Sequence, residues 1–245
     1  MSKKEQLRQQ REGTILNVTA KQQEKDIIQA ISNVVVYLSE QFETRIRIEH
    51  RKYWLLKDIV SELRSTFHGV ELHYHFENSS IRPDGGILLI KSNDEKDPLS
   101  YPILIAEVKN QGTNDIRVKE GKPLQAKGNA IERLGKNLIG LRTALMRENI
   151  FPFVCFGYGC DFEKTSSILD RVTTMAMFGN LNKIYLLNDG GGRFNRGSFF
   201  FRPEPWTVDE MTTIMKDIAE RSIYYYFAKY GKDRFLIPPN ISYSS

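Results

Sequence analysis

The sequence predicts an α/β fold in which a mixed central β-sheet is flanked by helices. Short aliphatic runs bounded by turn residues indicate strands, and longer stretches with apolar residues at helical spacing precede and follow them. The chain has 245 residues, 40% of them hydrophobic and 27% charged, so it can bury a full core as one domain. We expect residues 21–245 to form that domain. Residues 1–20 are expected to form a basic arm, either mobile or simply disordered.

The predicted helices follow from the 3.6-residue spacing of their apolar side chains. Helices are expected at 21–44, at 52–67, from residue 128 or 129 onwards, at 165–178 and at 207–230. The third has the clearest pattern, because Ile131, Leu134 and Leu138 lie on one stripe. Asn129 stands where an N-cap residue is expected.

The predicted strands are aliphatic or aromatic runs between polar segments. Strands are expected at 70–77, 83–91, 101–109, 151–157, 183–187 and 198–202. The second of these, PDGGILLIK, reads as a turn that enters a strand, because two glycines follow Pro-Asp and an aliphatic run follows them. The third, YPILIAEVK, follows after the polar segment 92–100. These two strands are therefore expected to form a hairpin.

Composition excludes several classes of protein. No apolar run approaches the roughly 18–20 residues of a membrane span, and the N-terminus lacks the hydrophobic segment of a secretory signal. We therefore expect a cytoplasmic protein with no membrane partner. Cys155 and Cys160 fit no zinc pattern, and His73 and His75 lack a third ligand at suitable spacing. The net charge of +5 and the pI near 9.1 are compatible with a polyanion partner.

The residues that point to chemistry lie on the two strands of the predicted hairpin. Asp84 belongs to the Pro-Asp-Gly-Gly turn, and Glu107 and Lys109 lie near the end of the second strand. If the hairpin loop centres near residue 95 or 96, Asp84 lies roughly opposite Glu107. Side chains alternate along a strand, so Glu107 and Lys109 share a face. Two carboxylates and one lysine therefore converge on one spot.

This combination suits magnesium-dependent cleavage of DNA. Mg²⁺ takes oxygen ligands and keeps several waters, so one or two carboxylates and a substrate phosphate suffice. The metal polarises the phosphate and lowers the pKa of a water, and a lysine orients that water or stabilises phosphoryl charge. Each fragment alone also has a structural interpretation, as a plain turn or as a surface ion pair. Their presence on adjacent strands in this order favours the metal site.

Three stretches together resemble the EcoRI family of type II restriction endonucleases. They are Ser79–Ile87 (SSIRPDGGI), Ala106–Gly112 (AEVKNQG) and Gly128–Arg133 (GNAIER). Phe151–Val154 is similar to the next strand of that family. A fainter similarity at Leu169–Thr173 lacks an expected arginine, because position 168 is Ile168. The clear resemblance spans residues 78–157.

The resemblance implies a homodimeric, Mg²⁺-dependent endonuclease that cleaves double-stranded DNA. Its fold would be the PD-(D/E)xK nuclease fold, with a restriction-endonuclease-like core. Carried over by position, Asp84 and Glu107 hold the metal, with the Val108 carbonyl as a further ligand. Lys109 assists the attacking water. Asp84, Glu107 and Lys109 are the implied catalytic residues.

The family also implies which residues bind DNA. An inner AATT would be read by Asn129, Ala130, Glu132 and Arg133, and the other DNA-binding candidates are Lys127, Lys136 and Arg171. An asparagine amide can pair bidentately with adenine, and arginine donates to purine acceptors. Asn129 and Arg133 are four residues apart and thus neighbours on one helical face. The alternative is a solvent-facing surface with a Glu132–Lys136 ion pair.

The cleavage pattern follows from the same resemblance. A cut before the inner AATT leaves 5′ overhangs, and a two-fold dimer presents one site to each strand of a palindrome. The outer base pairs stay open, with residues 125–127 as candidates for reading them. An enzyme that reads only the inner four base pairs is a further alternative.

Other functions stay open on these residues. A nuclease of the same fold that cuts by DNA structure in repair or recombination needs the same carboxylates and lysine, but leaves the GNAIER stretch unexplained. A non-catalytic DNA-binding protein would use the carboxylates structurally. A protein with no DNA role would show no salt-dependent DNA affinity. The loop 189–197 fits no phosphate-binding pattern, so its role stays open.

Overall fold

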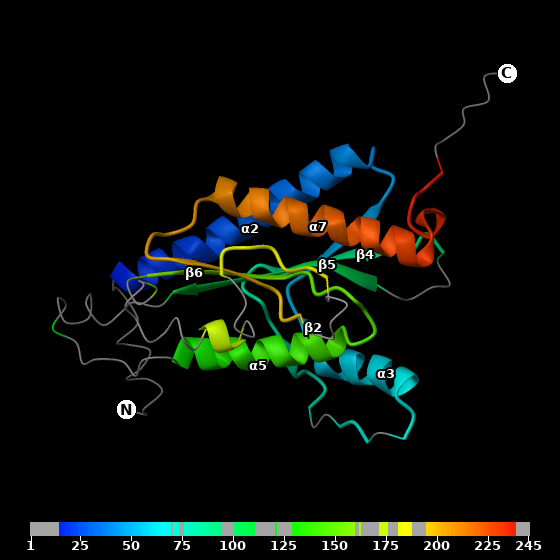
Figure 1. The fold of residues 1–245 in the computed structure, drawn as a ribbon, viewed down its shortest axis with the longest axis horizontal. Helices are drawn as coiled ribbons and strands as arrows, with labels where there is room; N and C mark the ends of the chain where they lie inside the picture. Colours follow the sequence, from blue (N-terminus) through cyan, green and yellow to red (C-terminus); the bar gives the residue numbers. More distant parts are fainter. Residues whose placement is uncertain are drawn as a thin grey trace.

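The protein is built around a mixed five-stranded sheet with helices on both faces (Figure 1). A computed structural model describes residues 15–69, 71–73, 76–94, 100–110, 121, 129–159, 162, 172–175, 181–187 and 195–238. The strand order is β1-β4-β5-β6-β7, with β1 at Arg47–Arg51, β4 at Gly86–Lys91, β5 at Ser100–Asn110, β6 at Phe153–Tyr158 and β7 at Ser198–Arg202. β1, β4 and β5 are antiparallel, whereas β5, β6 and β7 are parallel. The predicted mixed α/β fold is confirmed.

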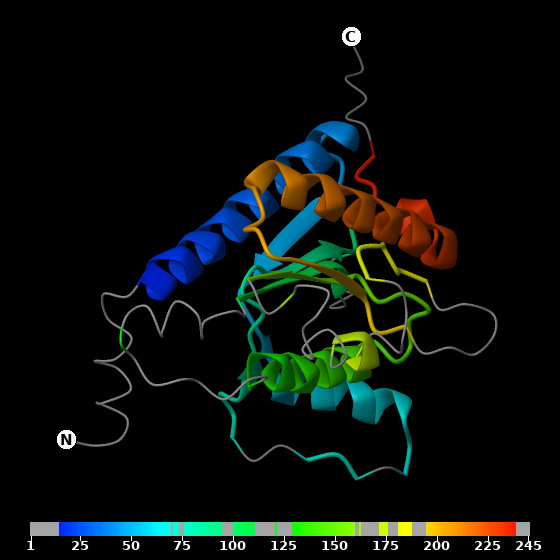
Figure 2. The same ribbon diagram turned by 60° about the vertical axis from the view of Figure 1, so that its left-hand side comes forward.

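Helices form a layer on each side of the sheet. Helices α2 (Ile15–Gln41) and α7 (Val208–Tyr230) lie together on one face, and α5 (Asn129–Ala144) lies on the other with α3 (Leu56–Thr66) beside it (Figures 1 and 2). The remaining described elements are a two-stranded ribbon of β2 (Trp54–Leu55) and β3 (Ser80–Ile81), a short helical segment at 172–175, and the 3₁₀ turn η2 (Lys232–Arg234). None of the described helices has the length and apolarity that a bilayer crossing demands.

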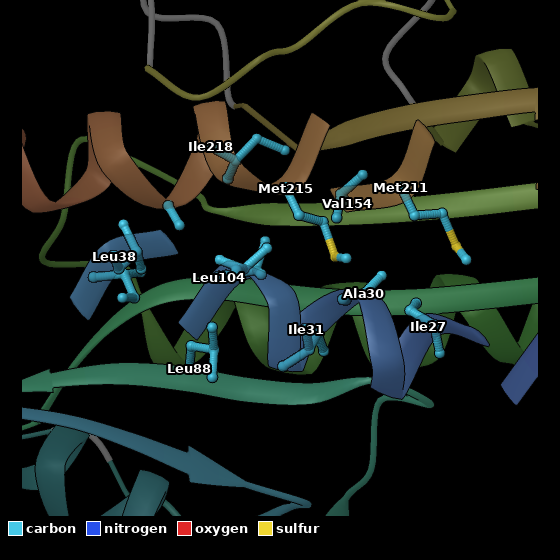
Figure 3. Close-up of a cluster of buried hydrophobic side chains, with 14 of the residues drawn as sticks. Ile27, Ala30, Ile31, Leu38, Leu88, Leu104, Val154, Met211, Met215 and Ile218 are labelled. Carbon is cyan, nitrogen blue, oxygen red and sulfur yellow. The ribbon is translucent and has the colours of Figure 1, made fainter. Parts of the chain in front are cut away.

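The alternation of side chains along the strands divides the core into two layers. Towards α2 and α7, a cluster is formed by Leu88, Leu104 and Val154 from the sheet and by Ile27, Ile31, Met211, Met215 and Ile218 from the helices (Figure 3). Towards α5, the cluster includes Ile87, Ile105, Phe153, Ile131, Leu134 and Leu138. Central strands buried on both faces read as continuous apolar runs, which is why β4, β5 and β6 were visible in the sequence.

The β4–β5 hairpin changes register at a β-bulge. Leu89 pairs with Pro102 and Leu88 with Leu104, so Ile103 is an extra residue on β5. Proline has no backbone N–H, and a bulge accommodates it at a point where the ladder is interrupted. Beyond the bulge, Gly86 pairs with Ala106. The bulge therefore sets which residues of β5 face the turn before β4.

Two of the predicted strands are not formed by the residues that the structure describes. In the segment predicted as a strand at 70–77, the described residues 71–73, 76 and 77 form none, and Phe76 is 74% exposed. Alternation alone was misleading here, because a strand of this kind needs one buried face. The predicted strand at 183–187 is reduced to a bridge between Ile150 and Leu187.

Side chains replace the missing ladder at 183–187. The Tyr185 N–H donates to Ser198 Oγ at 2.9 Å, and Asn195 Nδ2 donates to the Tyr185 carbonyl at 3.0 Å. Hydroxyl and amide side chains that satisfy backbone groups in this way compete with sheet formation. The sequence reading of 183–187 as a strand was therefore wrong.

The helix boundaries differ by a few residues from those predicted. The first helix already begins at Ile15, within the segment assigned to a basic arm; residues 1–14 lie outside the described part of the chain. The helix predicted at 52–67 begins at Leu56, because Trp54 and Leu55 pair with β3. The helix predicted at 165–178 lies largely outside the described residues, with 172–175 helical.

Candidate active site

A tight turn presents Asp84 at the start of β4. The Gly86 N–H donates to the Pro83 carbonyl at 3.0 Å, and the Gly85 N–H donates to the Ala106 carbonyl of β5 at 2.9 Å. Gly86 has φ +83°, and a Cβ there would lie 2.5 Å from the carbonyl oxygen of Arg51 on β1. A glycine is required at this position, because it combines a left-handed conformation with close backbone contact.

The second carboxylate and the lysine lie on the same face of β5. Glu107 and Lys109 share the face of Ile105, which packs towards α5. Glu107 is 1% exposed and pairs in register with the buried Cys155 of β6. The sheet thus holds a carboxylate inside the protein at the point where β5 passes the Asp84 turn.

These three side chains are in direct contact. Lys109 Nζ lies 2.8 Å from Asp84 Oδ2 and 2.5 Å from Glu107 Oε1. The Asp84 N–H donates to Glu107 Oε2 at 2.8 Å, and the Val108 N–H donates to Asp84 Oδ2 at 3.3 Å. The predicted convergence of Asp84, Glu107 and Lys109 is therefore observed. Asp84 lies beside both Glu107 and Val108, because the bulge moves the register by one residue.

Burial and charge act in opposite directions on these groups. Burial raises the pKa of Glu107, and neighbouring Lys109 only partly opposes this rise. For Lys109, burial alone would lower the pKa, but the carboxylates of Glu107 and Asp84 raise it above its ordinary value. Lys109 thus stays protonated in this arrangement, so it supplies hydrogen-bond donors and positive charge rather than accepting a proton.

The donor set fits a hard divalent cation. Asp84, Glu107 and the main-chain carbonyl of Val108 offer oxygen atoms, which Mg²⁺ prefers. The ammonium of Lys109 already lies against both carboxylates, so the carboxylate pair can accept a positive charge between its oxygens. Groups of three or more His, Cys, Asp or Glu side chains suited to a metal do not occur among the described residues.

Helix α5 presents two of the predicted DNA-binding residues to solvent. Arg133 and Lys136 are exposed, on the side of the helix away from the buried Leu134 and Leu138. Asn129 is the first residue of the helix rather than the N-cap residue before it. The side chains of Asn129, Ala130 and Glu132 lie outside the described part, as do the whole residues Lys127 and Arg171.

One residue in contact with the site was missed in the sequence. His50 Nε2 lies 2.8 Å from the Gly85 carbonyl oxygen. His50 belongs to β1, which was not predicted, although Ile46 and Ile48 alternate with charged residues just before it. That two-residue period was the available signal for a strand.

Comparisons with known proteins extend the resemblance to most of the chain. A family model described as restriction endonuclease EcoRI matches residues 9–233. The type II restriction enzyme RsrI of Cereibacter sphaeroides is 29% identical over 245 aligned residues, covering 86% of this chain and 87% of that protein. The type II restriction enzyme EcoRI of Escherichia coli is 38% identical over 182 residues, covering 60% of this chain and 65% of that protein. This chain therefore belongs to the EcoRI family of restriction endonucleases.

Proposed function

We propose that this protein is a type II restriction endonuclease that cleaves double-stranded DNA with Mg²⁺ as cofactor. The observation that carries the proposal is the contact of Asp84, Glu107 and Lys109 at the end of the hairpin. Family membership supports the reaction class, and RsrI and EcoRI are both type II restriction enzymes. With DNA as its substrate, the protein is expected to act in the cytoplasm.

Each residue of the cluster has a proposed role. Asp84, Glu107 and the Val108 carbonyl bind Mg²⁺. When bound, Mg²⁺ supplies Lewis-acid polarisation of the phosphate and a water of lowered pKa. Lys109 donates hydrogen bonds to the attacking water or to the phosphoryl oxygens, where its positive charge stabilises the negative charge that develops during cleavage. The buried floor of the site, with Glu107 1% exposed, restricts the competing water around these charges.

We propose that α5 reads the DNA sequence. The exposed Arg133 and Lys136 are available to base edges or phosphates, and the N-terminal end of a helix is a common means of presenting such groups in the major groove. Together with Asn129, Ala130 and Glu132 they would read a palindrome containing AATT. Cleavage before this sequence would leave 5′ overhangs.

We also propose that the protein acts as a homodimer, because each site cleaves one strand. Apolar side chains on α5 support this, since Ile139 is 69% exposed and Met146, just after the helix, is 50% exposed. The C-terminal helix α7 is a second candidate for the interface: Ile218 is buried in the core, but Tyr224 is 49% exposed. Sedimentation at several protein concentrations would give twice the chain mass if this proposal holds.

Digestion of a fully sequenced plasmid tests the proposed activity. The purified protein with Mg²⁺ should produce discrete fragments, and sequencing of their ends should show one short palindrome with 5′ overhangs. Asp84→Ala should abolish cleavage. Asp217→Ala is a matched control, because Asp217 lies on α7 with a half-exposed side chain and an ion pair to Arg221. Unchanged cleavage by Asp84→Ala would refute the metal site.

The same digestion separates the remaining alternatives. Ends scattered without a common sequence, or cleavage of branched DNA alone, would indicate a structure-specific nuclease. DNA binding that is indifferent to Mg²⁺, with no cleavage by the wild-type protein, would indicate a non-catalytic DNA-binding protein.

A further inference from the structure

The edge strand β1 contacts the turn that carries Asp84. His50 reaches from β1 to the Gly85 carbonyl, with Nε2 at 2.8 Å from the oxygen. A carbonyl oxygen can only accept a hydrogen bond, so Nε2 must carry the proton in this contact. Histidine therefore acts as a donor across the gap between the edge of the sheet and the metal-site turn.

Contacts from opposite sides hold this turn. From β5, the Ala106 carbonyl accepts from the Gly85 N–H at 2.9 Å, and Glu107 Oε2 accepts from the Asp84 N–H at 2.8 Å. From β1, the His50 ring and the Arg51 carbonyl lie against Gly86: a Cβ there would be 2.7 Å from His50 Nε2. The imidazole is thus packed directly on the glycine that closes the turn.

The peptide unit between Gly85 and Gly86 has particular need of such a contact. With glycine on both sides, this unit can rotate with little steric resistance. Its N–H donates to the Pro83 carbonyl at 3.0 Å, and its carbonyl accepts from His50. Both polar groups are therefore satisfied in one orientation of the peptide plane. Loss of the His50 donor would leave that orientation dependent on a single hydrogen bond.

We propose that His50 is a positioning residue that fixes the Gly85–Gly86 peptide and, through it, the carboxylate of Asp84 relative to Glu107. His50 does not contact the reacting atoms; it acts through the backbone of the turn. This inference deepens the proposed function, because it concerns the metal site through which cleavage would occur. Partners behind metal ligands commonly change metal affinity or activity by about 10–100-fold when removed.

Two substitutions of His50 separate positioning from general structure. The amide nitrogen of glutamine can reach nearly as far as Nε2 and donate a hydrogen bond, whereas the asparagine side chain is too short to reach the Gly85 carbonyl. His50→Gln should therefore preserve the contact and His50→Asn should lose it, although both remain polar on an edge strand. Thermal unfolding of both variants should match that of the wild-type protein within a few degrees.

The first readout is metal binding, with Mn²⁺ as the probe because the EPR signal of the free ion is lost on binding. His50→Asn should weaken Mn²⁺ binding by about 10-fold, and His50→Gln should stay close to the wild-type protein. The Mg²⁺ concentration that half-saturates DNA cleavage should rise in parallel, with DNA affinity measured without divalent metal unchanged. Equal metal affinities in all three proteins would overturn the proposal.

The second readout is hydrogen exchange at the Gly86 amide, which needs neither metal nor activity. This amide should exchange faster in His50→Asn than in His50→Gln, while amides of β6 stay unchanged. If the wild-type protein fails to cleave, the proposed function falls, and hydrogen exchange still decides whether His50 fixes the turn. Identical exchange in the two variants would refute that role.

Discussion

Replacement of Lys109 by methionine would test the electrostatics of the site, because the substitution removes the ammonium group and leaves an unbranched apolar side chain. Lys109 Nζ contacts Asp84 and Glu107 at 2.8 and 2.5 Å, and the three side chains are 17%, 26% and 2% exposed, respectively. Methionine keeps the apolar stem and removes the charge. Two neighbouring carboxylates would then remain, one of them buried, without their cationic partner.

The expected loss of stability depends on whether the buried carboxylate of Glu107 can take up a proton. Removal of one partner from a buried pair costs about 3–5 kcal/mol when nothing compensates. Here Glu107 can take up a proton, and for a carboxyl with an ordinary pKa of 4.5 that costs about 3 kcal/mol at pH 7. Asp84 also keeps some contact with water. We therefore expect a loss of about 2–3 kcal/mol in the free energy of unfolding near pH 7.

The sign of the pH dependence is fixed by Glu107. Burial raises its pKa in the folded state, so the unfolded chain releases this proton at lower pH than the folded protein does. The stabilisation that Glu107 contributes is therefore fully present below its ordinary pKa of 4.5 and decreases as the pH rises. Without Lys109, the free energy of unfolding falls further between pH 5 and pH 7. The loss of stability caused by Lys109→Met should therefore shrink to under about 1 kcal/mol near pH 5.

Urea unfolding at about pH 5 and pH 7, with EDTA and with Mg²⁺, would measure the difference in the free energy of unfolding between the wild-type protein and Lys109→Met. Mg²⁺ should recover part of the loss near pH 7, because it replaces the missing positive charge, while DNA cleavage stays abolished. Lys183→Met, at an exposed lysine, is the control and should change stability by under about 0.5 kcal/mol. A loss of equal size at both pH values, insensitive to Mg²⁺, would refute the reasoning.

Three further substitutions test other parts of the structure. Gly86→Ala should destabilise the protein by about 2 kcal/mol or more in urea unfolding and abolish cleavage, because a Cβ meets the Arg51 carbonyl at φ +83°. Glu148→Gln should cost about 1–3 kcal/mol by the same measure, because the buried carboxylate accepts hydrogen bonds from Lys229 and Tyr230. Arg133→Ala should leave stability unchanged but reduce discrimination between cognate and non-cognate DNA by about 1–3 kcal/mol in competition binding.

The central part of the fold was predictable because its strands are buried on both faces. Such strands appear as unbroken apolar runs, as in β4, β5 and β6, and α5 and α7 were visible through their helical period. The edge strand β1 was not predictable in this way. β1 has a single isoleucine, Ile48, among charged and polar residues, and in the false strand at 183–187 the backbone groups of Tyr185 are bonded to Ser198 and Asn195.

The site was predictable where its residues are close in sequence or joined by a hairpin. Asp84, Glu107 and Lys109 could be brought together from strand alternation and the turn alone. The bulge at Ile103 and the approach of His50 could not, since both depend on how neighbouring strands pair in three dimensions. Such contacts have no local signature in a single sequence.

The bulge at Ile103 limits which changes of chain length the protein can tolerate in β5. Deletion of Ile103 would let the residues after it move one place along β4, and side-chain alternation would then reverse their faces. Glu107 would take the position of Ala106, beside Ile27 and Ile31 of α2. The Glu107 carboxylate would thus enter the apolar core, while Val108 would face the proposed metal site. Between Ile103 and Glu107, single-residue insertions and deletions should therefore be absent from relatives that retain cleavage.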